Sequence, residues 1–589
     1  MDKEFFYRKL PFYQLIFDYC DILHFQCSIF ETRILNMQKA FIDLSQHQHS
    51  FKSIILCCAI VFAISCKDTS SKIKPRVFHY NQVNFITSLD PAFAKTQNNI
   101  WAIDHLFNQL IDLNDSMQLI PEIAKSWNIS EDGMQYQFII RDDIYFHRDP
   151  CFGRDSTRKL IANDIVFSFN RLLDPKVNSS GSWIFRDNVD LSKPFEALND
   201  SVFIIHLNSP FSPLLQMLTM QYCSVVPEEA VLYYKNEISQ HPVGTGPFQL
   251  KKWIGRRGLF LSRNPNYFKT GLPILEGVRI SFIEDRNTAY LEFLKKEIDF
   301  FSGLQSGFAL QLVTKNGDLR DDRVDQMQMH KGDYLNTEYI GINLSLLNKN
   351  HPLHDKRVRQ ALNFAIDRKT MLRLLKFGIG TPALQGFIPK GLPTSYEYNY
   401  NGYNYNPDSA KQLLKLAGYE SKDNFPELTI YTNKDYLDLI TFVAKQWEEI
   451  GIPVKIDLVE TATLREKMRQ SELQLFRASW IADYPDEESF LNVFYSKNPA
   501  PPNYTRFNNP EFDHLYSEAI KETVRPRREK LYQQMNQIII DEAPVVFLFY
   551  DQTAWFVQKQ IVNLKSNPLN LLKLEEVDER KQEAIGNGQ

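Results

Sequence analysis

The sequence predicts a protein of the α/β or α+β class that folds around more than one hydrophobic core. Its 589 residues exceed the roughly 250–300 residues at which a single core stops growing, so at least two lobes are expected. Residues 427–459 also have the pattern strand, helix, strand, which is the building unit of parallel or mixed sheets. The composition, with 43% hydrophobic and 23% charged residues, is that of an ordinary globular protein and excludes whole-chain disorder, collagen-like repeats and a multi-span membrane architecture.

The first part of the chain, from about residue 80 to 260, is rich in turns and short strands. Tyr136–Arg141 and Val202–Leu207 are examples of short, mostly apolar runs that indicate strands. No internal repeat and no low-complexity tract follows residue 66.

Two helices further along the chain have clear boundaries. The first is predicted over Arg357–Phe377 and ends at Gly378, with an apolar stripe of Val358, Ala361, Leu362 and Ala365. The second begins where Asn406 can cap and Pro407 fits the first helical position, and it ends at Gly418. Its apolar face consists of Ala410, Leu413, Leu414 and Ala417.

The strand–helix–strand unit is defined by its periodicity. Glu427–Thr432 reads as a strand, Asp435–Ile450 as a helix that stops at Gly451, and Pro453–Val459 as a half-buried strand. Ile440, Val443, Ala444 and Trp447 have the spacing of one helix face. Such a unit places its two strands parallel in one sheet.

Charge and motifs exclude several functions. The chain has 67 Lys+Arg against 71 Asp+Glu, a net charge of −4, and therefore lacks the basic excess typical of a nucleic-acid binder. It contains no G-x-S-x-G, H-E-x-x-H or Walker A motif. The glycine-rich segment Gly244–Pro247 is interpreted as a turn, because Pro247 removes a backbone donor that a phosphate would need. We therefore predict no catalytic residue, metal site or cofactor.

The N-terminal region has the features of a targeting segment. Ile54–Ile64 is an uncharged apolar run of the length of a signal-peptide core, too short to span a bilayer. Ala63–Cys66 resembles a bacterial lipobox, in which the cysteine is lipidated and becomes the first residue, and the polar segment that follows suits a tether. We expect residues 1–65 to be a signal peptide with an N-terminal extension, for which Met37 is an alternative start. The other interpretation of the apolar run is a buried core helix beside a chance cysteine.

Several motifs, taken together and in order, resemble one family, the solute-binding proteins of oligopeptide and dipeptide ABC importers. They extend over roughly residues 76–570. Each is weak alone, and their common order carries the resemblance. The segments are Ser88–Pro91, His105–Phe107, Pro121–Trp127, Glu131–Gly133, Phe138–Phe146, Ala162–Phe169, Pro242–Phe248, Arg263–Tyr267, Asp355–Asp367 and Trp480–Asn492.

The resemblance implies a two-lobed type II periplasmic-binding-protein fold with an additional inserted domain. Carried onto this chain, lobe I is discontinuous and comprises residues 67–116, 243–334 and 552–589. The inserted domain comprises residues 117–242, and lobe II comprises residues 335–551. The strand–helix–strand unit falls within lobe II.

The resemblance also implies a ligand site between the lobes. Asp483 matches the family position whose carboxylate pairs with the peptide α-ammonium, with a turn or helix-capping Asp as the alternative. Trp480 matches a position that lines a side-chain pocket, and its alternative role is ordinary core. Arg477 corresponds to an arginine near the cleft, which meets either a peptide carboxylate or a carboxylate of the protein itself.

Further contacts are expected from two other segments. Tyr339, Gly341 and Asn343 lie where the chain crosses into lobe II and are expected to line the cleft, and Trp183 or Phe185 is expected to contribute from the inserted domain. Near Cys151–Asp155 and Lys176–Asp190 the sequence departs from the family pattern, which puts contacts from that side in doubt. Cys151 and Cys223 both fall in the inserted domain, where they form either a disulfide in an oxidising compartment or two free thiols.

The implied function is a lipid-anchored extracytoplasmic receptor that captures peptides and delivers them to ABC-transporter permease subunits. It is expected to be a monomer, to bind no nucleic acid, to touch the membrane through the Cys66 anchor alone, and not to be an enzyme. The alternatives are the same fold with another cargo, such as a nickel chelate, haem, an oligosaccharide or a murein peptide, and a sensor without transport. A free carboxylate at Asp483 favours a ligand with an ammonium group, and so favours peptides over nickel chelates.

Overall fold

The computed structural model describes residues 76–305, 307–392, 400–419 and 424–580. The chain divides into a unit Met1–Lys74 and a unit Pro75–Gln589, and only the second contains described residues. The N-terminal extension, the apolar run 54–64 and the predicted lipidation site Cys66 therefore lie outside the described residues. Within the described part, no helix is both long enough and apolar enough to cross a membrane.

The core of the second unit is a mixed sheet of eleven strands, which confirms the predicted α/β class. Ten strands follow one path through the sheet, and the short strand β13 (Thr381–Pro382) pairs with β17 off this path. Along the path, the strands are β15 (Val454–Leu458), β14 (Leu428–Thr432), β16 (Leu475–Ile481), β12 (Met327–Ile342), β17 (Val545–Gln558), β11 (Phe300–Ser302), β1 (Val77–Asn81), β10 (Gly277–Ser281), β9 (Gly258–Arg263) and β8 (Phe248–Ile254).

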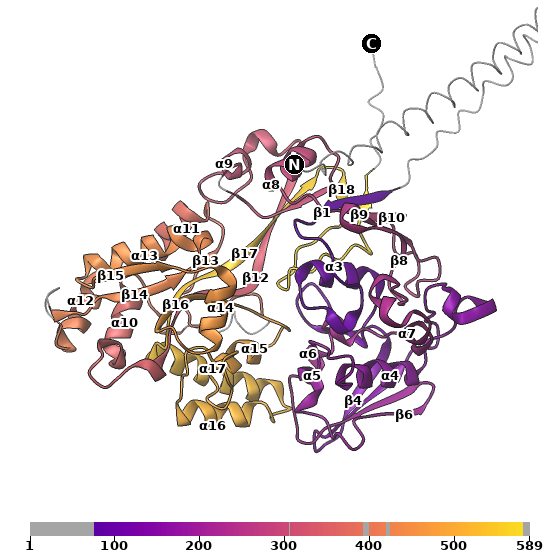
Figure 1. Ribbon diagram of the computed structural model, residues 1–589, viewed down its shortest axis with the longest axis horizontal. Coiled ribbons are helices and arrows are strands. Elements are labelled where there is room, and N and C mark those ends of the chain that lie inside the picture. The colour runs from indigo at the N-terminus through magenta and orange to yellow at the C-terminus, as the bar shows by residue number, and fades with distance from the viewer. Residues whose placement is uncertain (1–75, 306, 393–399, 420–423, 581–589) are drawn as a thin grey trace, which may run out of the picture. The chain divides into compact units, whose positions relative to one another are not determined.

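The two long central strands, β12 and β17, connect the two halves of this sheet (Figure 1). They are antiparallel, and their register shifts between Asp333 and Thr337. The buried cores change at the same place. Leu335, Tyr339 and Tyr550 belong to one hydrophobic core. Met327 and Ala554, on the other side of this register shift, belong to a different core. The predicted lobe borders, 334/335 and 551/552, fall at this change, and the domain assignment itself stays a prediction.

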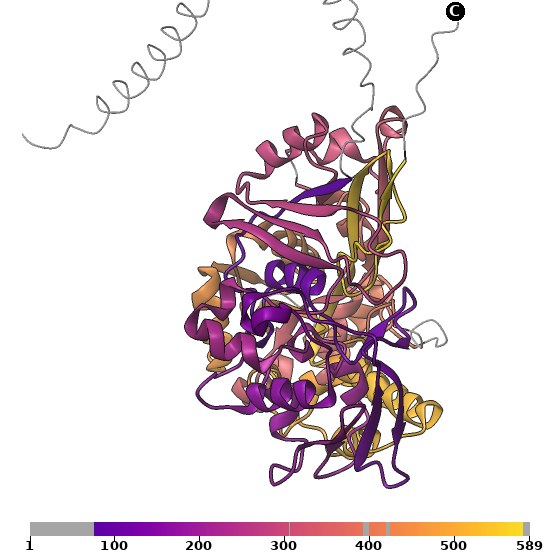
Figure 2. The same ribbon diagram turned by 90° about the vertical axis from the view of Figure 1, so that its right-hand side faces the viewer.

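A separate antiparallel sheet of four strands lies within residues 117–242. Its strand order is β4 (Ala124–Ile129), β5 (Gln135–Ile140), β7 (Val202–His206) and β6 (Phe195–Asn199). Helix α4 (Ala162–Leu173) packs on β6 and β7, so that one face of the sheet is covered (Figure 2). Phe169 of α4 contacts both Phe195 and Phe203. Two short ladders complete the strands, β2 (Ile111–Leu113) with β3 (Leu119–Pro121) and β18 (Ile561–Val562) with β19 (Asp578–Glu579).

The other helices are distributed along the chain. The described ones are α3 (Gln97–Leu106), α5 (Trp183–Arg186), α6 (Leu214–Met217), α7 (Glu228–Tyr234), α8 (Arg286–Leu294), α9 (Ala309–Leu312), α10 (Lys356–Phe364), α11 (Arg368–Leu375), α12 (Pro407–Leu416), α13 (Leu437–Glu449), α14 (Thr461–Arg469), α15 (Glu488–Leu491), α16 (Pro510–Ala519) and α17 (Arg525–Glu542).

The predicted strand–helix–strand unit is confirmed as β14, α13 and β15. The two strands pair in parallel, with Leu428 opposite Val454. Trp447, expected on the apolar face of the helix, is completely buried. The strands predicted at 136–141 and 202–207 are β5 and β7, and the capped helix after Asn406 is α12, whose Ser409 amide donates to the Asn406 side chain.

One predicted helix is wrong in extent. The segment 357–377 forms two helices, α10 and α11, instead of one. The reason is Asp367, whose carboxylate accepts a hydrogen bond from the Thr370 amide and so starts a new helix. A helix-capping side chain inside a continuous apolar stripe marks this break.

The glycine-rich segment at 244–247 lies outside helices and strands, bends at Gly246 and Pro247, and makes a tight backbone contact. A side chain on Gly244 or Gly246 would collide with the backbone of Leu106 at the end of α3. The two cysteines of the inserted region are free thiols, so the second of the two alternatives is the one present. Cys223 is completely buried, whereas Cys151 is half-buried.

Candidate functional site

The candidate site is the loop that follows β16. Trp480 and Ile481 end the strand, and Asp483 stands two residues later, before the short helix α15. The loop is held by its own hydrogen bonds. The Trp480 indole donates to the Ser489 carbonyl at 2.5 Å, and the Asp483 amide donates to the Ser489 hydroxyl at 3.3 Å. The Ala482 amide also donates to the Leu335 carbonyl on β12, at 2.8 Å.

Asp483 presents an open carboxylate. Its side chain is exposed to solvent, yet desolvation by the surrounding protein raises its pKa to about 6. Both hold for a group that water reaches although protein atoms lie on most sides of it. No hydrogen bond or ion pair within the described part of the chain offsets this desolvation. A carboxylate in such a place is favourable for a cationic partner.

Aromatic side chains of the inserted region face this loop. The rings of Trp183 and Tyr484 have their centroids 6.3 Å apart. Tyr222 is close enough for the charge of Asp483 to raise the pKa of its phenol, after the larger effect of burial. Trp183 is 37% exposed. The structure therefore brings predicted residues Asp483, Trp480 and Trp183 into one neighbourhood, with Tyr222 and Tyr484 as additional members.

The loop rests on a buried carboxyl. Glu488 accepts hydrogen bonds from the hydroxyls of Tyr484 and Tyr516, and burial raises its pKa to about 7. The Glu488 amide, at the start of α15, donates to the Asp486 carboxylate at 2.9 Å. Glu488 ties the loop to α16, and this fixes the backbone that carries Asp483.

Arg477 meets a carboxylate of the protein. Its guanidinium forms a buried ion pair with Glu338 on the neighbouring strand β12 and lies over the ring of Tyr436. Of the two roles expected for Arg477, this structure contains the pairing with a protein carboxylate. Phe185, named as an alternative to Trp183, is completely buried in the core.

Tyr339, Gly341 and Asn343 differ from the expectation of a cleft-lining strand. Tyr339 is completely buried against Phe387, with ring centroids 5.1 Å apart. A side chain on Gly341 would collide with the ring of Phe476. Asn343 is completely buried, and its side chain accepts from the Ser345 amide at 3.1 Å. Tyr339 and Gly341 lie in β12, which pairs with β16 and β17 on its two edges and packs against core side chains, and Asn343 follows the end of this strand.

Three residues of this neighbourhood, Glu338, Tyr222 and Glu488, were not predicted from the sequence. Glu338 has a recognisable signal in the sequence, because it is the single charged residue in the run 335–342. The roles of Tyr222 and Glu488 come from contacts between segments far apart in the chain, and no local pattern indicates them.

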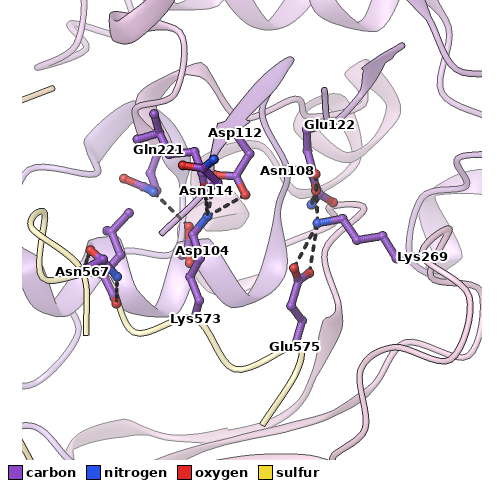
Figure 3. Close-up of polar contacts among 12 residues, drawn as sticks. Asp104, Asn108, Asp112, Asn114, Glu122, Gln221, Lys269, Asn567, Lys573 and Glu575 are labelled. Atoms are coloured by element: carbon purple, nitrogen blue, oxygen red, sulfur yellow. Dashed lines mark hydrogen bonds and ion pairs between the residues drawn. The ribbon is translucent and has the colours of Figure 1, made fainter. Parts of the chain in front are cut away.

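A second polar cluster lies where the β2–β3 hairpin meets the C-terminal segment (Figure 3). Lys573 contacts the carboxylate of Asp112 at 2.6 Å, and Lys269 contacts Glu122 at 2.9 Å and Glu575 at 3.0 Å. A recess of about 200 Å³ lies beside it and is lined in part by these same ion pairs. Because both lysines are already paired, the cluster fastens the C-terminal segment to the hairpin.

Burial raises the pKa of two carboxyl groups in this cluster. It raises the pKa of Glu122 to about 7, against the opposing charge of Lys269, and the pKa of Asp104 to about 6. Asp104 accepts from the Gln221 side chain at 2.9 Å and Glu122 from the Asn108 side chain at 2.7 Å (Figure 3). Among the described residues, no group of three or more His, Cys, Asp or Glu side chains has an arrangement that could hold a metal ion.

Comparisons with known proteins identify the family to which this chain is similar. Residues 118–502 match the model of the bacterial extracellular solute-binding proteins, family 5 middle region. Heme-binding protein A of Haemophilus influenzae is 31% identical over 461 residues, which cover 74% of this chain and 80% of that protein. The dipeptide-binding protein of Escherichia coli K12 is 26% identical over 494 residues, or 80% of this chain and 88% of that protein.

Solved structures have the same fold. The periplasmic binding protein DppA of Helicobacter pylori, in complex with the peptide STSA, superposes with a TM-score of 0.70 at 25% identity and covers 86% of this chain and 98% of its own. HbpA2 of Haemophilus parasuis superposes with a TM-score of 0.75 at 24% identity and covers 86% of this chain and all of its own. The order of motifs, the mixed sheet and the match over residues 118–502 agree, and the chain belongs to the family 5 bacterial extracellular solute-binding proteins.

Proposed function

We propose that this protein captures peptides through their free α-ammonium group at Asp483 and delivers them to the permease subunits of an ABC transporter. One observation carries the proposal. Asp483 is a solvent-reached carboxylate with no partner in the described part of the chain, and desolvation raises its pKa to about 6. An ammonium ion in contact with it would relieve that desolvation penalty.

Peptides of different sequence share an ammonium, a carboxylate and an extended backbone. A receptor that tolerates varied side chains has to bind those shared groups, and roomy hydrated pockets then accept the rest. Two similar proteins support a peptide cargo: the dipeptide-binding protein of E. coli, and DppA of H. pylori, which was solved with the peptide STSA.

Ligand binding would favour the closed state of the two lobes. Asp483 follows β16 in lobe II, whereas Trp183 and Tyr222 belong to the inserted region, so one ligand can contact both sides. Interactions made with both sides at once shift the population toward closure. In this proposal the protein is an extracytoplasmic monomer without catalytic activity or cofactor, and ATP hydrolysis belongs to other subunits.

The test compares peptides whose ammonium is free or blocked. Alanine peptides of two to five residues are titrated by calorimetry, each with a free amino group and as its N-acetyl derivative. We expect the free forms to bind at least about tenfold more tightly, since one good charge interaction is worth about 1.4 kcal/mol or more. Equal binding of the acetylated forms, or no binding of any peptide, would contradict the proposal.

A second cargo, haem, is favoured by one observation, the 31% identity to a protein named heme-binding protein A. The same preparation separates the two candidates. Titration with haemin, followed by its absorbance, would show a saturable complex if haem is the cargo, and would show none under the peptide proposal.

We also propose that the mature protein is anchored through a lipid on Cys66. The support is the sequence alone: the apolar run 54–64 and the lipobox-like Ala63–Cys66. Metabolic labelling with a palmitate analogue is expected to tag the wild-type chain, and Cys66→Ser is expected to abolish the label and release the protein from membranes. Equal labelling of the Cys66→Ser chain would refute the anchor. Cys151→Ser, which leaves Cys66 in place, is the matched control and should keep the label.

A further inference from the structure

Arg477 and Glu338 form a buried ion pair, which affects the ligands that this receptor can recognise. The two side chains come from adjacent antiparallel strands, with Arg477 on β16 opposite Ile340 on β12, two residues from Glu338. Both are almost completely buried, with side-chain exposures of 10% for Arg477 and 4% for Glu338. The guanidinium also lies over the Tyr436 ring, which closes one of its faces.

The charges around this pair are balanced. Asp551 lies beside Glu338 and pairs with Lys376 at 3.3 Å. The Asn336 side chain donates to Glu338 at 3.3 Å and to Asp551 at 3.4 Å, which joins the two pairs. Two cations and two carboxylates therefore form one network, in which the positive charge of Arg477 is already compensated.

Glu338 occupies one nitrogen of the Arg477 guanidinium, and the Nε donor has no partner but is buried, so a ligand carboxylate would have to displace Glu338 to pair with this charge. That exchange would leave a buried carboxylate without its cation, and burying an unpaired charge is strongly unfavourable. Asp483, six residues further along the chain, has no such internal partner among the described residues. The described site thus has one carboxylate without a partner, Asp483, and one cation whose charge is already paired, Arg477.

We infer that this receptor recognises the ammonium end of its ligand and gains nothing at Arg477 from a terminal carboxylate. The inference rests on the proposed function and narrows its substrate class. The ligands are amine-bearing chains for which a free C-terminus is not required, including peptides with a C-terminal amide.

The test uses the alanine peptides of two to five residues as free acids and as C-terminal amides, titrated against the wild-type protein. At every length, we expect the Kd values of acid and amide to agree within about threefold. A preference of more than threefold for the free acid at any length would overturn the inference. This result differs from a failure of the proposed function. If the proposed function fails, N-acetylated peptides bind as well as free ones, or no peptide binds.

A variant tests the role of Glu338 directly. Glu338→Gln frees Arg477, and in this protein the free acid is expected to bind about tenfold more tightly than the amide, at the peptide length whose carboxylate reaches the arginine. The double variant Glu338→Gln with Arg477→Gln removes the freed cation and should return the ratio to about one. An unchanged acid-to-amide ratio in folded Glu338→Gln would show that Glu338 does not close this site. If the variant fails to fold, the wild-type comparison still decides the inference.

Discussion

Asp483→Asn is expected to weaken the binding of peptides with a free α-ammonium by about 2–5 kcal/mol, a factor of about thirty to several thousand. Asn has the volume of Asp and keeps the loop hydrogen bond of the residue 483 amide, so the change removes the charge and little else. The loss arises because the ligand ammonium would be desolvated at this site without an anion to compensate it. Calorimetric titration with a free alanine peptide measures the effect.

The matched control is Asp435→Asn in the same lobe, which makes the same charge change at an exposed position. It should leave the Kd within about twofold, because long-range effects of surface charges are screened at physiological salt. If Asp483→Asn bound the peptide as tightly as the control does, the assignment of the ammonium site would be wrong.

The pH dependence of binding in the wild-type protein follows from the same carboxylate. With a ligand-free pKa of about 6, Asp483 is ionised above that pH and becomes neutral below it. Affinity should therefore be lost as pH falls through 6, approaching about tenfold per pH unit. At the other end, affinity should decline above about pH 8, where the peptide α-amino group loses its proton. Asp483→Asn should abolish the acidic limb and keep the basic one.

Trp447→Ala is expected to lower the free energy of unfolding by about 3–5 kcal/mol. Trp447 is completely buried on α13, in the core that also includes Val358 and Leu362 of α10. Its indole donates to the Leu362 carbonyl at 3.0 Å. Alanine would leave a large cavity and an unpaired buried carbonyl, and both effects destabilise the folded state.

Urea or thermal unfolding, followed by circular dichroism, measures this loss. Lys445→Ala, an exposed position on the same helix, is the control and should stay within about 0.5 kcal/mol of wild type. Trp447→Phe keeps most of the ring volume and should cost less than Trp447→Ala. Equal stability of Trp447→Ala and Lys445→Ala would mean that this helix does not depend on the predicted apolar face.

Local patterns of the sequence predicted the elements well where one segment contains its own signal. The apolar spacing that ends in Trp447, the cap at Asn406 and the alternation at 453–459 each depend on residues within about one turn or one strand. The fold class follows from such elements, since a strand–helix–strand unit of this length has to cross over within one sheet. The break between α10 and α11 was not predicted, because the apolar stripe favours one continuous helix. The signal for the break is the capping residue Asp367, which is equally local.

The site depended on contacts that no local pattern contains. Asp483 was placed by the resemblance of its segment to a family motif, and its exposure and lack of a described partner come from the tertiary structure. Glu338 lies 139 residues from Arg477 in the chain, and only the pairing of β12 with β16 brings the two charges together. Tyr339 is likewise in the core through a distant contact, because its ring packs against Phe387.

The sequence by itself determined the α/β class, most element positions and the carboxylate that we propose for the ammonium site. The tertiary structure decided which charges remain open to a ligand. A side chain's residue type sets its charge, but its availability depends on whether another segment compensates that charge in the folded state. Arg477 and Asp483 stand six residues apart in the chain, and the fold pairs the charge of the first with Glu338 and leaves the second without a partner among the described residues.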